Sequence, residues 1–441
     1  MSTQTSSAAP TPAMSAPSFL RRHGLWFFML ALMLVLPWVF YDHEKGRHSG
    51  FAITLLSEMA LMSIFALSYN MLMGQAGLLS FGHAVLFGVG AYFVAHTLNF
   101  IKASGLPIPV ELMPLVGGIG GLVCGVLTGY VATKQRATAF AMITMGIGEL
   151  LTAAALMFMT FFGGEGGITT DRVVDTSLFG IPYTRPIQVY YLIVAWAMIA
   201  ALLMFLQTQT PLGRMANASR DNYERTQFVG YDPRVIRYWQ FILAGFFAGI
   251  AGGMYCLVYE IVTFDTLAAV KSANALLATY IGGAVGFFGP IMGAVLVVGM
   301  QSGVSLHTSA WLLYLGVVFI AMVIYAPGGL LGLFANHIPI ARMGRLGELV
   351  VPYARILVPG LMMTLGFVLF VELTTHQTIN AAQGKKFSLL GFAPDPGGTV
   401  VWLSAIVAMI GGALWVRYEG RFFMAKWNAL IEDAKARGIV A

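Results

Sequence analysis

The chain has 441 residues, a formal net charge of +6 at pH 7 and a hydrophobic fraction of 58%. Only 10% of its residues are charged, whereas a typical soluble domain has about 25%. The polar surface needed to cover a soluble core is missing, which excludes a soluble enzyme and predicts an integral membrane protein. The basic residues are spread over the loops rather than gathered on one face, so nucleic-acid binding is not expected.

The first 24 residues (1–24) are rich in Ser, Thr, Ala and Pro. Such a composition cannot bury a core, so the segment is predicted to be a disordered tail on the cytoplasmic side. An apolar run from Leu25 to Tyr41 follows Arg21 and Arg22. No small-residue cleavage site comes after this run, which favours an uncleaved first span over a signal peptide.

The rest of the chain contains apolar runs of about 20 residues, the length that a helix needs to cross a bilayer. Predicted spans lie near 51–73, 78–99, 114–132, 138–162, 187–206, 239–262, 310–326, 355–373 and 398–416. A further long run, 272–306, is either one span or a pair interrupted at Gly286–Pro290, because Pro removes a backbone donor and Gly disfavours a helix.

The positive-inside rule decides between these two topologies. With the interruption, both termini and most Lys and Arg residues lie on the cytoplasmic side; without it, the basic residues after 306 move outside. The sequence therefore predicts an all-α polytopic membrane protein with about 10–12 transmembrane helices and a broken or short helix pair near 272–306.

A polar segment, residues 208–238, separates two of the predicted spans. It contains the signals that begin, support and end a helix. These are, in chain order, Thr210 and Pro211, the i, i+4 pair Asp221 and Arg225, and Gly230. The sequence predicts a single capped helix over 211–229 on the cytoplasmic side, which either rests on lipid headgroups or docks a soluble partner.

No Walker motif is found. The only Gly-Lys pair, Gly384–Lys385, is followed by Lys386, and Ile379 stands where the first motif glycine should be. There is also no catalytic constellation or metal-ligand cluster in the sequence. We therefore expect that the chain is not an enzyme and binds no cofactor or metal, and that any ATP it depends on is hydrolysed by another chain.

Two acidic residues, Glu58 and Glu149, lie deep inside predicted spans, where a carboxylate is costly unless it faces a polar interior or is protonated. Glu149 shares a helical face with Thr152, and Glu58 shares a less continuous face with Ser68. Both acids, with Thr152, are candidates for the translocation pathway or for contact with a substrate ammonium group. The alternative is a hydrogen-bonded carboxyl that joins helices.

Two further membrane features have predicted roles. Gly286 and Pro290 leave unpaired backbone groups within the membrane, which is typical of a gate or pathway element. His83 lies beside a stripe of small residues that predicts close helix packing, and it is expected to hydrogen-bond a neighbouring helix rather than relay protons. The stripe consists of Ala84, Gly88, Ala91 and Ala95.

Five stretches carry a resemblance to a known family. They are "YNMLMGQAGLLSFGHAVLFGVGAYFVA" (Tyr69–Ala95), "AMITMGIGELLTAAALMFMTFFGGEGGIT" (Ala141–Thr169), Thr210–Tyr255, "IGGAVGFFGPIMGA" (Ile281–Ala294) and "YAPGGLLGLF" (Tyr325–Phe334). In this order they resemble the LivM-type permease subunits of high-affinity branched-chain amino-acid ABC importers. The resemblance covers most of residues 51–334.

The resemblance implies a permease domain over 25–334 in the bacterial inner membrane. Its implied partners are a sister permease, two cytoplasmic ATP-binding subunits and an external solute-binding protein. It also implies that the polar segment couples the permease to the ATPase. The coupling candidates are Pro211, Gly213, Arg214, Arg220, Asp221, Arg225 and Gly230.

Residues 335–441 depart from the family pattern as a C-terminal extension with two further predicted spans. Within the family, branched-chain or related amino acids are the expected cargo, and urea, short amides or another small solute are the alternatives. An ion-coupled secondary transporter is the competing class, because intramembrane acids and broken helices are also typical of it.

Overall fold

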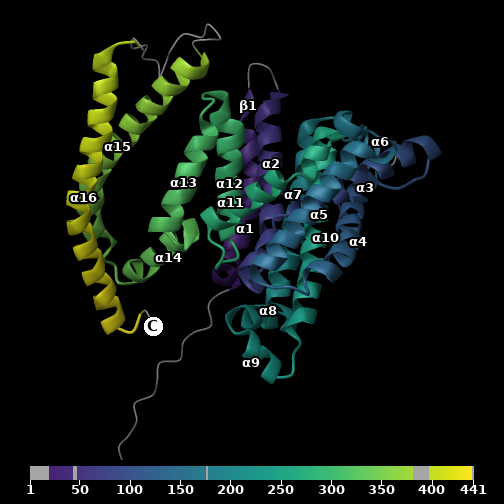
Figure 1. The fold of residues 1–441 in the computed structure, drawn as a ribbon, viewed down its shortest axis with the longest axis horizontal. Coiled ribbons are helices and arrows are strands. Elements are labelled where there is room, and N and C mark those ends of the chain that lie inside the picture. The colour runs from purple at the N-terminus through teal and green to yellow at the C-terminus, as the bar shows by residue number, and fades with distance from the viewer. Residues whose placement is uncertain (1–18, 43–46, 175–176, 381–396, 440–441) are drawn as a thin grey trace, which may run out of the picture.

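The computed structural model describes residues 19–42, 47–174, 177–380 and 397–439, and it shows an array of packed helices (Figure 1). The α-helices are α1 (Phe19–Val39), α2 (Gly50–Asn70), α3 (His83–Ser104), α4 (Met113–Ala132), α5 (Ala137–Met157), α6 (Met159–Phe162), α7 (Pro186–Gln209), α8 (Pro211–Asp221), α9 (Tyr223–Phe228), α10 (Pro233–Tyr259), α11 (Ala269–Gly282), α12 (Gly289–Val298), α13 (Trp311–Tyr325), α14 (Gly329–Arg342), α15 (Val350–Thr375) and α16 (Thr399–Ala436). The predicted all-α polytopic fold is confirmed.

Short elements connect or extend these helices. The strands form two antiparallel pairs, β1 (Tyr41–Asp42) with β2 (Arg47–His48) and β3 (Ile168–Thr169) with β4 (Ile261–Val262). The π-helical segments are η1 (Met71–Gln75), η5 (Gly299–Gly303) and η8 (His376–Asn380). The 3-10 helices are η2 (Val110–Leu112), η3 (Gly164–Gly166), η4 (Phe264–Thr266), η6 (Val304–Leu306) and η7 (Leu346–Leu349).

Nine helices of the described residues are long and apolar enough to cross a membrane, or ten if the bent pair α13 and α14 is one span. The apolar part of α1, Gly24–Val39, is shorter than these, and α11 has only 14 residues. Residues 19–24, predicted to belong to the N-terminal tail, begin α1 instead. The rest of that predicted tail and the Gly384–Lys385 pair lie outside the described residues.

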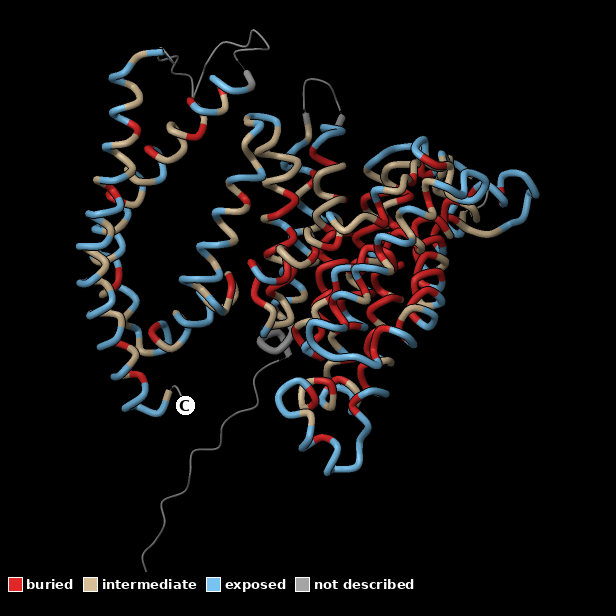
Figure 2. The backbone as a smooth tube through the Cα atoms, in the orientation of Figure 1, coloured by how far each residue is buried: buried red, intermediate tan, exposed pale blue. Residues whose placement is uncertain are grey.

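The core lies where α10 packs against α3 and α4, and the buried positions concentrate there (Figure 2). Glycines bring these backbones together: a Cβ atom on Gly249 would lie 2.2 Å from the Gly117 carbonyl oxygen. The predicted small-residue stripe of α3 is buried in this core. Next to the stripe, the His83 ring hydrogen-bonds the Ser68 hydroxyl of α2 at 2.9 Å, which confirms the predicted interhelical role.

The predicted interruption near 272–306 is confirmed. The helix ends at Gly282 and restarts at Gly289, and η5 and η6 extend α12 into an 18-residue apolar segment, Gly289–Leu306. Gly283 has φ +105°, a conformation that side chains with a Cβ rarely adopt. The two helices fold back on each other closely, because a Cβ on Gly293 would lie 1.8 Å from the Ala278 carbonyl oxygen.

Two other interruptions are not predicted by the sequence. The predicted span 138–162 ends at Met157, where Phe158 leaves the helical conformation. A second bent pair, α13 and α14, turns by 43°. Gly329, at that bend, packs on the first interruption, since a Cβ there would lie 2.3 Å from the Gly283 backbone nitrogen. The two bends therefore contact each other through glycines.

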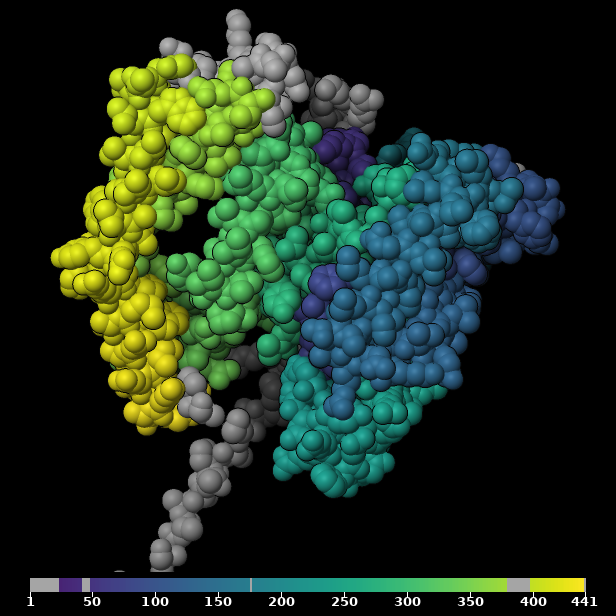
Figure 3. All heavy atoms as spheres, viewed as in Figure 1, coloured from purple at the N-terminus to yellow at the C-terminus, as the bar shows by residue number. Residues whose placement is uncertain are grey.

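The helices α15 and α16 pack on each other and stand apart from the core (Figure 1). Several contacts attach this C-terminal hairpin to the rest, among them a hydrogen bond of 2.6 Å between the His337 ring of α14 and the Tyr353 hydroxyl of α15. The Tyr314 hydroxyl of α13 donates a hydrogen bond to Glu372 of α15 at 2.8 Å, and Arg345 before η7 pairs with Asp433 of α16. Figure 3 shows openings between the hairpin and α13.

Candidate coupling surface and transport pathway

The polar segment forms two helices rather than the single helix predicted over 211–229. The Thr210 hydroxyl accepts the Gly213 N–H at 3.3 Å and begins α8, as predicted. At Asn222 the backbone becomes extended, and the side-chain oxygen accepts the Arg225 N–H at 2.9 Å, which starts α9. Asn is among the strongest N-cap residues, and here its capping conformation prevails over helix continuation.

Because of this interruption the predicted Asp221–Arg225 pair does not form, but the segment still ends at the predicted glycine. Asp221 pairs with Arg220 at 2.9 Å, not with Arg225. Gly230 has φ +94° and ends the segment, as predicted. Asp232 then accepts the Arg234 N–H at 2.8 Å and caps α10.

Two of the predicted coupling residues face the membrane helices. The Arg220 guanidinium donates a hydrogen bond to the Gly74 carbonyl in η1, and its methylene groups lie against Gly77. Gly213 is buried, and a Cβ there would lie 2.4 Å from the Gln207 carbonyl oxygen. These residues attach α8 to the membrane domain rather than presenting it to a partner.

A chain of buried glutamines continues this attachment and was not predicted. Gln207 of α7 donates to the Gln240 side chain of α10 at 2.8 Å, and Gln240 donates to Gln75 of η1 at 2.8 Å. Burying a side-chain amide without a hydrogen-bond partner costs free energy, so the three hydrogen-bonded glutamines hold the ends of α7, α10 and η1 together. The available signal was a glutamine at one end of each of three apolar runs.

The other coupling candidates lie on the outer surface of the segment. Pro211, Arg214, Asp221, Arg225 and Gly230 are exposed. The tip also carries two apolar residues that sequence reasoning missed, Phe228 and Val229, which are 89% and 68% exposed. We call the exposed face of α8 and α9, with this tip, the coupling surface; it projects beyond the ends of the membrane helices (Figure 1).

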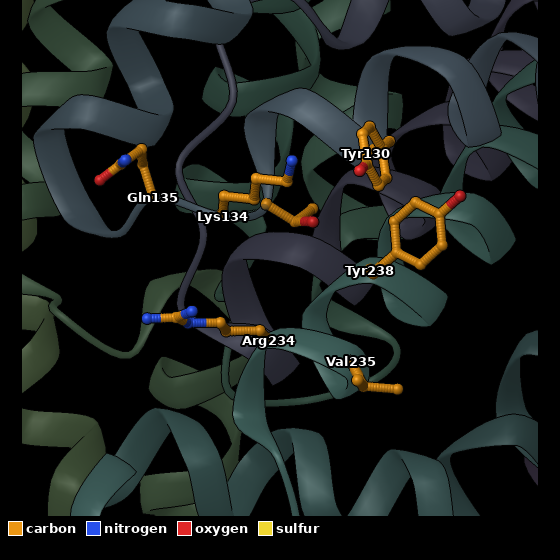
Figure 4. A pocket seen from close by; sticks show the side chains of 7 residues that line it. Tyr130, Lys134, Gln135, Arg234, Val235 and Tyr238 are labelled. Atoms are coloured by element: carbon orange, nitrogen blue, oxygen red, sulfur yellow. The ribbon is translucent and has the colours of Figure 1, made fainter.

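A cation–π contact holds α9 against the start of α5, because the Arg136 guanidinium lies 3.6 Å from the centre of the Tyr223 ring. Beside this contact is an open pocket of about 470 Å³ between the end of α4 and the start of α10 (Figure 4). Lys134 and Arg234 line it with Tyr130 and Tyr238. The pocket adds positive charge to the end of the molecule that carries the coupling surface.

The interruption between α11 and α12 lies next to the attachment point of α8. A Cβ on Gly74 would lie 2.5 Å from the Ala284 carbonyl oxygen, so η1 touches the interruption directly. Gly286 packs under the Leu331 side chain of α14, and Pro290 is buried at the start of α12. The chain of contacts from Arg220 through Gly74 therefore ends at the predicted pathway element.

An aromatic cluster covers the same interruption. Trp26 of α1 lies 5.3 Å from Phe288 and 5.5 Å from Phe205 of α7, and Phe205 lies 5.3 Å from Phe287, measured between ring centres. Offset and edge-to-face aromatic pairs at such distances are attractive. The interruption is thus closed on one side by rings and approached on another by η1.

The two intramembrane acids do not form one site. Glu149 is exposed near the middle of α5, on a face that also exposes Met142 and Met145. Thr152 donates to the Gly148 carbonyl of its own helix at 2.9 Å. Glu58 is half-buried between helices, where its carboxylate accepts a hydrogen bond from Ser302 of η5 at 2.9 Å.

At the end opposite the coupling surface, the loop after α6 is fixed to its surroundings. Lys102 of α3 donates to Asp171 at 2.9 Å, and this hydrogen bond lowers the pKa of the Asp171 carboxyl from its ordinary value. Arg172 pairs with Glu260 at 3.4 Å. Glu165, in the same loop, is exposed.

Comparison with known proteins identifies the family of this chain. Residues 51–326 match the family described as "Branched-chain amino acid transport system / permease component". The chain belongs to this family. The matched range includes Glu58, Glu149, the coupling surface and the α11–α12 interruption, whereas the C-terminal hairpin lies beyond it.

Several curated permeases are similar to this one. The high-affinity branched-chain amino acid transport system permease protein LivM of Salmonella typhimurium is 26% identical over 326 residues, covering 69% of this chain and 74% of its own. LivM of Escherichia coli is 24% identical over 345 residues, covering 73% and 78%. The galactofuranose transporter permease protein YtfT of Escherichia coli is 26% identical over 280 residues, covering 60% and 74%. No solved structure matches the chain.

Family membership and the membrane helices together place this permease in the bacterial inner membrane as a multi-pass protein. As the permease component of a transport system, it works with an energising subunit and a solute-binding subunit on other chains.

Proposed function

We propose that the chain is the transmembrane subunit of an ATP-binding-cassette importer that moves branched-chain or related amino acids into the cell. In this assembly it pairs with a sister permease, two cytoplasmic ATP-binding subunits and an external solute-binding protein. The partners hydrolyse ATP, and this chain binds no cofactor or metal and catalyses no reaction. The LivM relatives, whose names specify branched-chain amino acids, support the cargo.

The observation that carries the proposal is that the segment containing α8 and α9 has two different sides. Its inner side contacts the membrane helices, and its outer side is free to bind a partner. Its outer side is polar with an apolar tip at Phe228, which suits a soluble protein partner better than a lipid surface. A helix that only rested on headgroups would turn its apolar residues towards the bilayer, whereas this tip projects away from the membrane helices.

Movement of the ATPase reaches the pathway through the inner side. A displacement of α8 pulls on η1 through the Arg220–Gly74 hydrogen bond, and η1 presses on the interruption at Ala284. A hydrogen bond from a charged group contributes about 1.5–3 kcal/mol, enough to shift the balance between two states of a bistable element. Because the glycine contacts are close, a displacement of η1 also moves the interruption between α11 and α12.

The sister permease covers the exposed face of α5. A carboxylate at mid-membrane on a lipid-facing surface costs about 2.5–3.5 kcal/mol or more. The Glu149 side chain has no partner helix within the described part of this chain, and a second permease supplies one. Glu149 then lines the passage between the two permeases, with Thr152 one turn away.

Transport of the complex tests the function. The chain is co-expressed with the two ATPases, the second permease and the binding protein, and is reconstituted in proteoliposomes. We expect ATP-dependent uptake of leucine, isoleucine or valine. Uptake of galactofuranose, fructose or urea in their place assigns another cargo within the family, and uptake by the chain alone on an ion gradient, without ATP, rejects the importer proposal in favour of a secondary transporter.

A further inference from the structure

A lysine that the sequence places between two predicted spans lies inside the helix array. Lys271 is the third residue of α11 and is half-buried. Its ammonium nitrogen lies 5.0 Å from the centre of the Tyr255 ring and 5.5 Å from that of Phe87. Among the residues that the structure describes, no carboxylate lies within 4.0 Å of this nitrogen.

An opposite charge lies nearby without touching it. The Glu58 carboxylate attracts Lys271 electrostatically and accepts a hydrogen bond from Ser302 at 2.9 Å, and Tyr259 lies close to it. Tyr255 and Tyr259 are one helical turn apart on α10, with ring centres separated by 4.5 Å. The Tyr255 ring faces Lys271, and Tyr259 lies close to Glu58.

Keeping the Lys271 and Glu58 charges apart inside the membrane costs free energy unless a third group pairs with them. A charge within the membrane is normally paired with an opposite charge, because desolvation is otherwise not offset. Lys271 has a long flexible side chain and Glu58 is close enough to attract it, yet aromatic rings rather than the carboxylate surround the ammonium group. The arrangement leaves a positive and a negative group facing the same aromatic surface.

The cluster lies towards the end at which an importer receives its cargo. Glu58 is eight residues after the start of α2, or about 12 Å along the helix. Tyr259 is the last residue of α10, and β4 follows it. These helix ends lie opposite the coupling surface (Figure 1).

We propose that Glu58 and Lys271 bind the charged main-chain groups of an α-amino acid during its passage. Lys271 binds the α-carboxylate, Glu58 binds the α-ammonium group, and the faces of Phe87 and Tyr255 contact the apolar side chain. This inference rests on the proposed function and specifies its cargo as a zwitterion. Sugars and urea carry neither charge and gain nothing from such a pair.

A zwitterion can bind between the two groups only if they do not pair directly. A charge-assisted hydrogen bond spans about 2.7–2.9 Å, and a zwitterion inserted between the side chains makes two of them in series. A direct Glu58–Lys271 ion pair within 4.0 Å leaves no room for such a ligand, and the structure has none.

The test is direct binding of radiolabelled L-leucine to the complete transporter in nanodiscs, without the solute-binding protein, together with uptake when that protein is present. Lys271→Met keeps the length of the side chain and removes its charge, and Glu58→Gln does the same for the acid. We expect each variant to lose about tenfold or more in leucine affinity and in uptake, because each removes a charge-assisted hydrogen bond. Leucinamide, which lacks the carboxylate, should compete with leucine far less well in the wild type.

Matched controls carry the same chemical changes elsewhere. Lys102→Met removes a lysine that is 60% exposed at the outer end of α3, and Glu165→Gln removes an exposed acid. Both should bind leucine as the wild type does. Lys271→Arg retains the cation and should recover part of the binding, whereas a purely structural lysine would give no such dependence on charge.

Two outcomes overturn the inference. Wild-type leucine affinity in Lys271→Met shows that the lysine does not touch the cargo, and it leaves the proposed importer function intact. Failure of both Lys271→Met and Lys271→Arg to assemble, with melting temperatures well below that of Lys102→Met, shows that the cluster only joins helices. Absence of any amino-acid uptake by the wild-type complex would instead refute the proposed function itself.

Discussion

The helices around α10 and the C-terminal hairpin have nearly the same apolar composition but different packing. The most apolar part of α10 has a mean hydropathy of 2.0 and is 78% buried, whereas that of α16 has the same mean hydropathy and is 11% buried. The difference lies in the neighbours of each helix, because α10 packs against α2, α3 and α4, whereas α16 packs mainly against α15. Glycines bring the backbones together in both regions. Hydropathy thus predicts insertion into the membrane, small residues allow helix pairs to pack closely, and the number of neighbouring helices decides which helix is buried in a protein core.

The largest effect is expected from a valine in place of a core glycine, compared with the same substitution in the hairpin. Gly249→Val places a branched side chain against the Gly117 carbonyl and should prevent assembly, because overpacking commonly costs about 1–3 kcal/mol and more where backbone must move. Gly420→Val in α16 is the matched control, since nothing lies within 4 Å of its added Cβ. Fluorescence-detected size exclusion in detergent compares the two, and equal profiles would contradict the packing argument.

The second prediction concerns the inner side of the coupling segment. Arg220→Met keeps the methylene contacts with Gly77 and removes the hydrogen bond to Gly74. Uptake should fall about tenfold, because a charged hydrogen bond is worth about 1.5–3 kcal/mol, while the ATPase remains bound. Arg421→Met, at an exposed position of α16 outside the coupling surface, is the control, and equal uptake in the two variants would remove Arg220 from the coupling path.

The third prediction concerns the tip. Phe228→Ser removes the most exposed aromatic side chain of the coupling surface and should weaken ATPase retention by a factor of about five to thirty, equivalent to 1–2 kcal/mol. Phe179→Ser changes a phenylalanine that is 75% exposed at the opposite end and should leave retention unchanged. Pull-down of the ATPase with each variant provides the measurement, and unchanged retention in Phe228→Ser would favour a tip that meets no partner.

The smallest effect is expected from removal of the hairpin. A chain that stops after Gly344 lacks α15 and α16 but keeps the whole matched range, 51–326. Uptake in proteoliposomes should stay within about twofold of the full chain, because few buried contacts are lost. A loss of assembly with the second permease or the ATPases would show that the extension is part of the interface.

The sequence predicted those features that depend on local chemistry. Composition and hydropathy predicted the membrane helices, and Thr210 and Gly230 predicted helix ends that the structure confirms. The interruption at Gly286–Pro290 followed from backbone chemistry and from the distribution of basic residues. Each of these features depends either on a few neighbouring residues or on the composition of the whole chain. Neither kind of information requires knowledge of tertiary contacts.

The missed features depend on contacts between distant segments. Asn222 is acceptable inside a helix and is also a strong cap, and only tertiary context selects the cap. Periodicity placed Glu149 on a polar face but could not tell whether that face meets this chain or another. Lys271 looked like a loop residue because it lies between apolar runs, and its aromatic neighbours come from α3 and α10.

The openings between the hairpin and α13 have a consequence for the working protein in its natural surroundings (Figure 3). Acyl chains fill space of this kind in a bilayer, so we expect lipid rather than side chains to occupy these openings. Extraction into detergent replaces this lipid with detergent molecules. The angle of the hairpin, held by the Tyr314 and Arg345 contacts at two heights, should then follow the thickness and fluidity of the membrane as the cell adjusts its lipids to temperature.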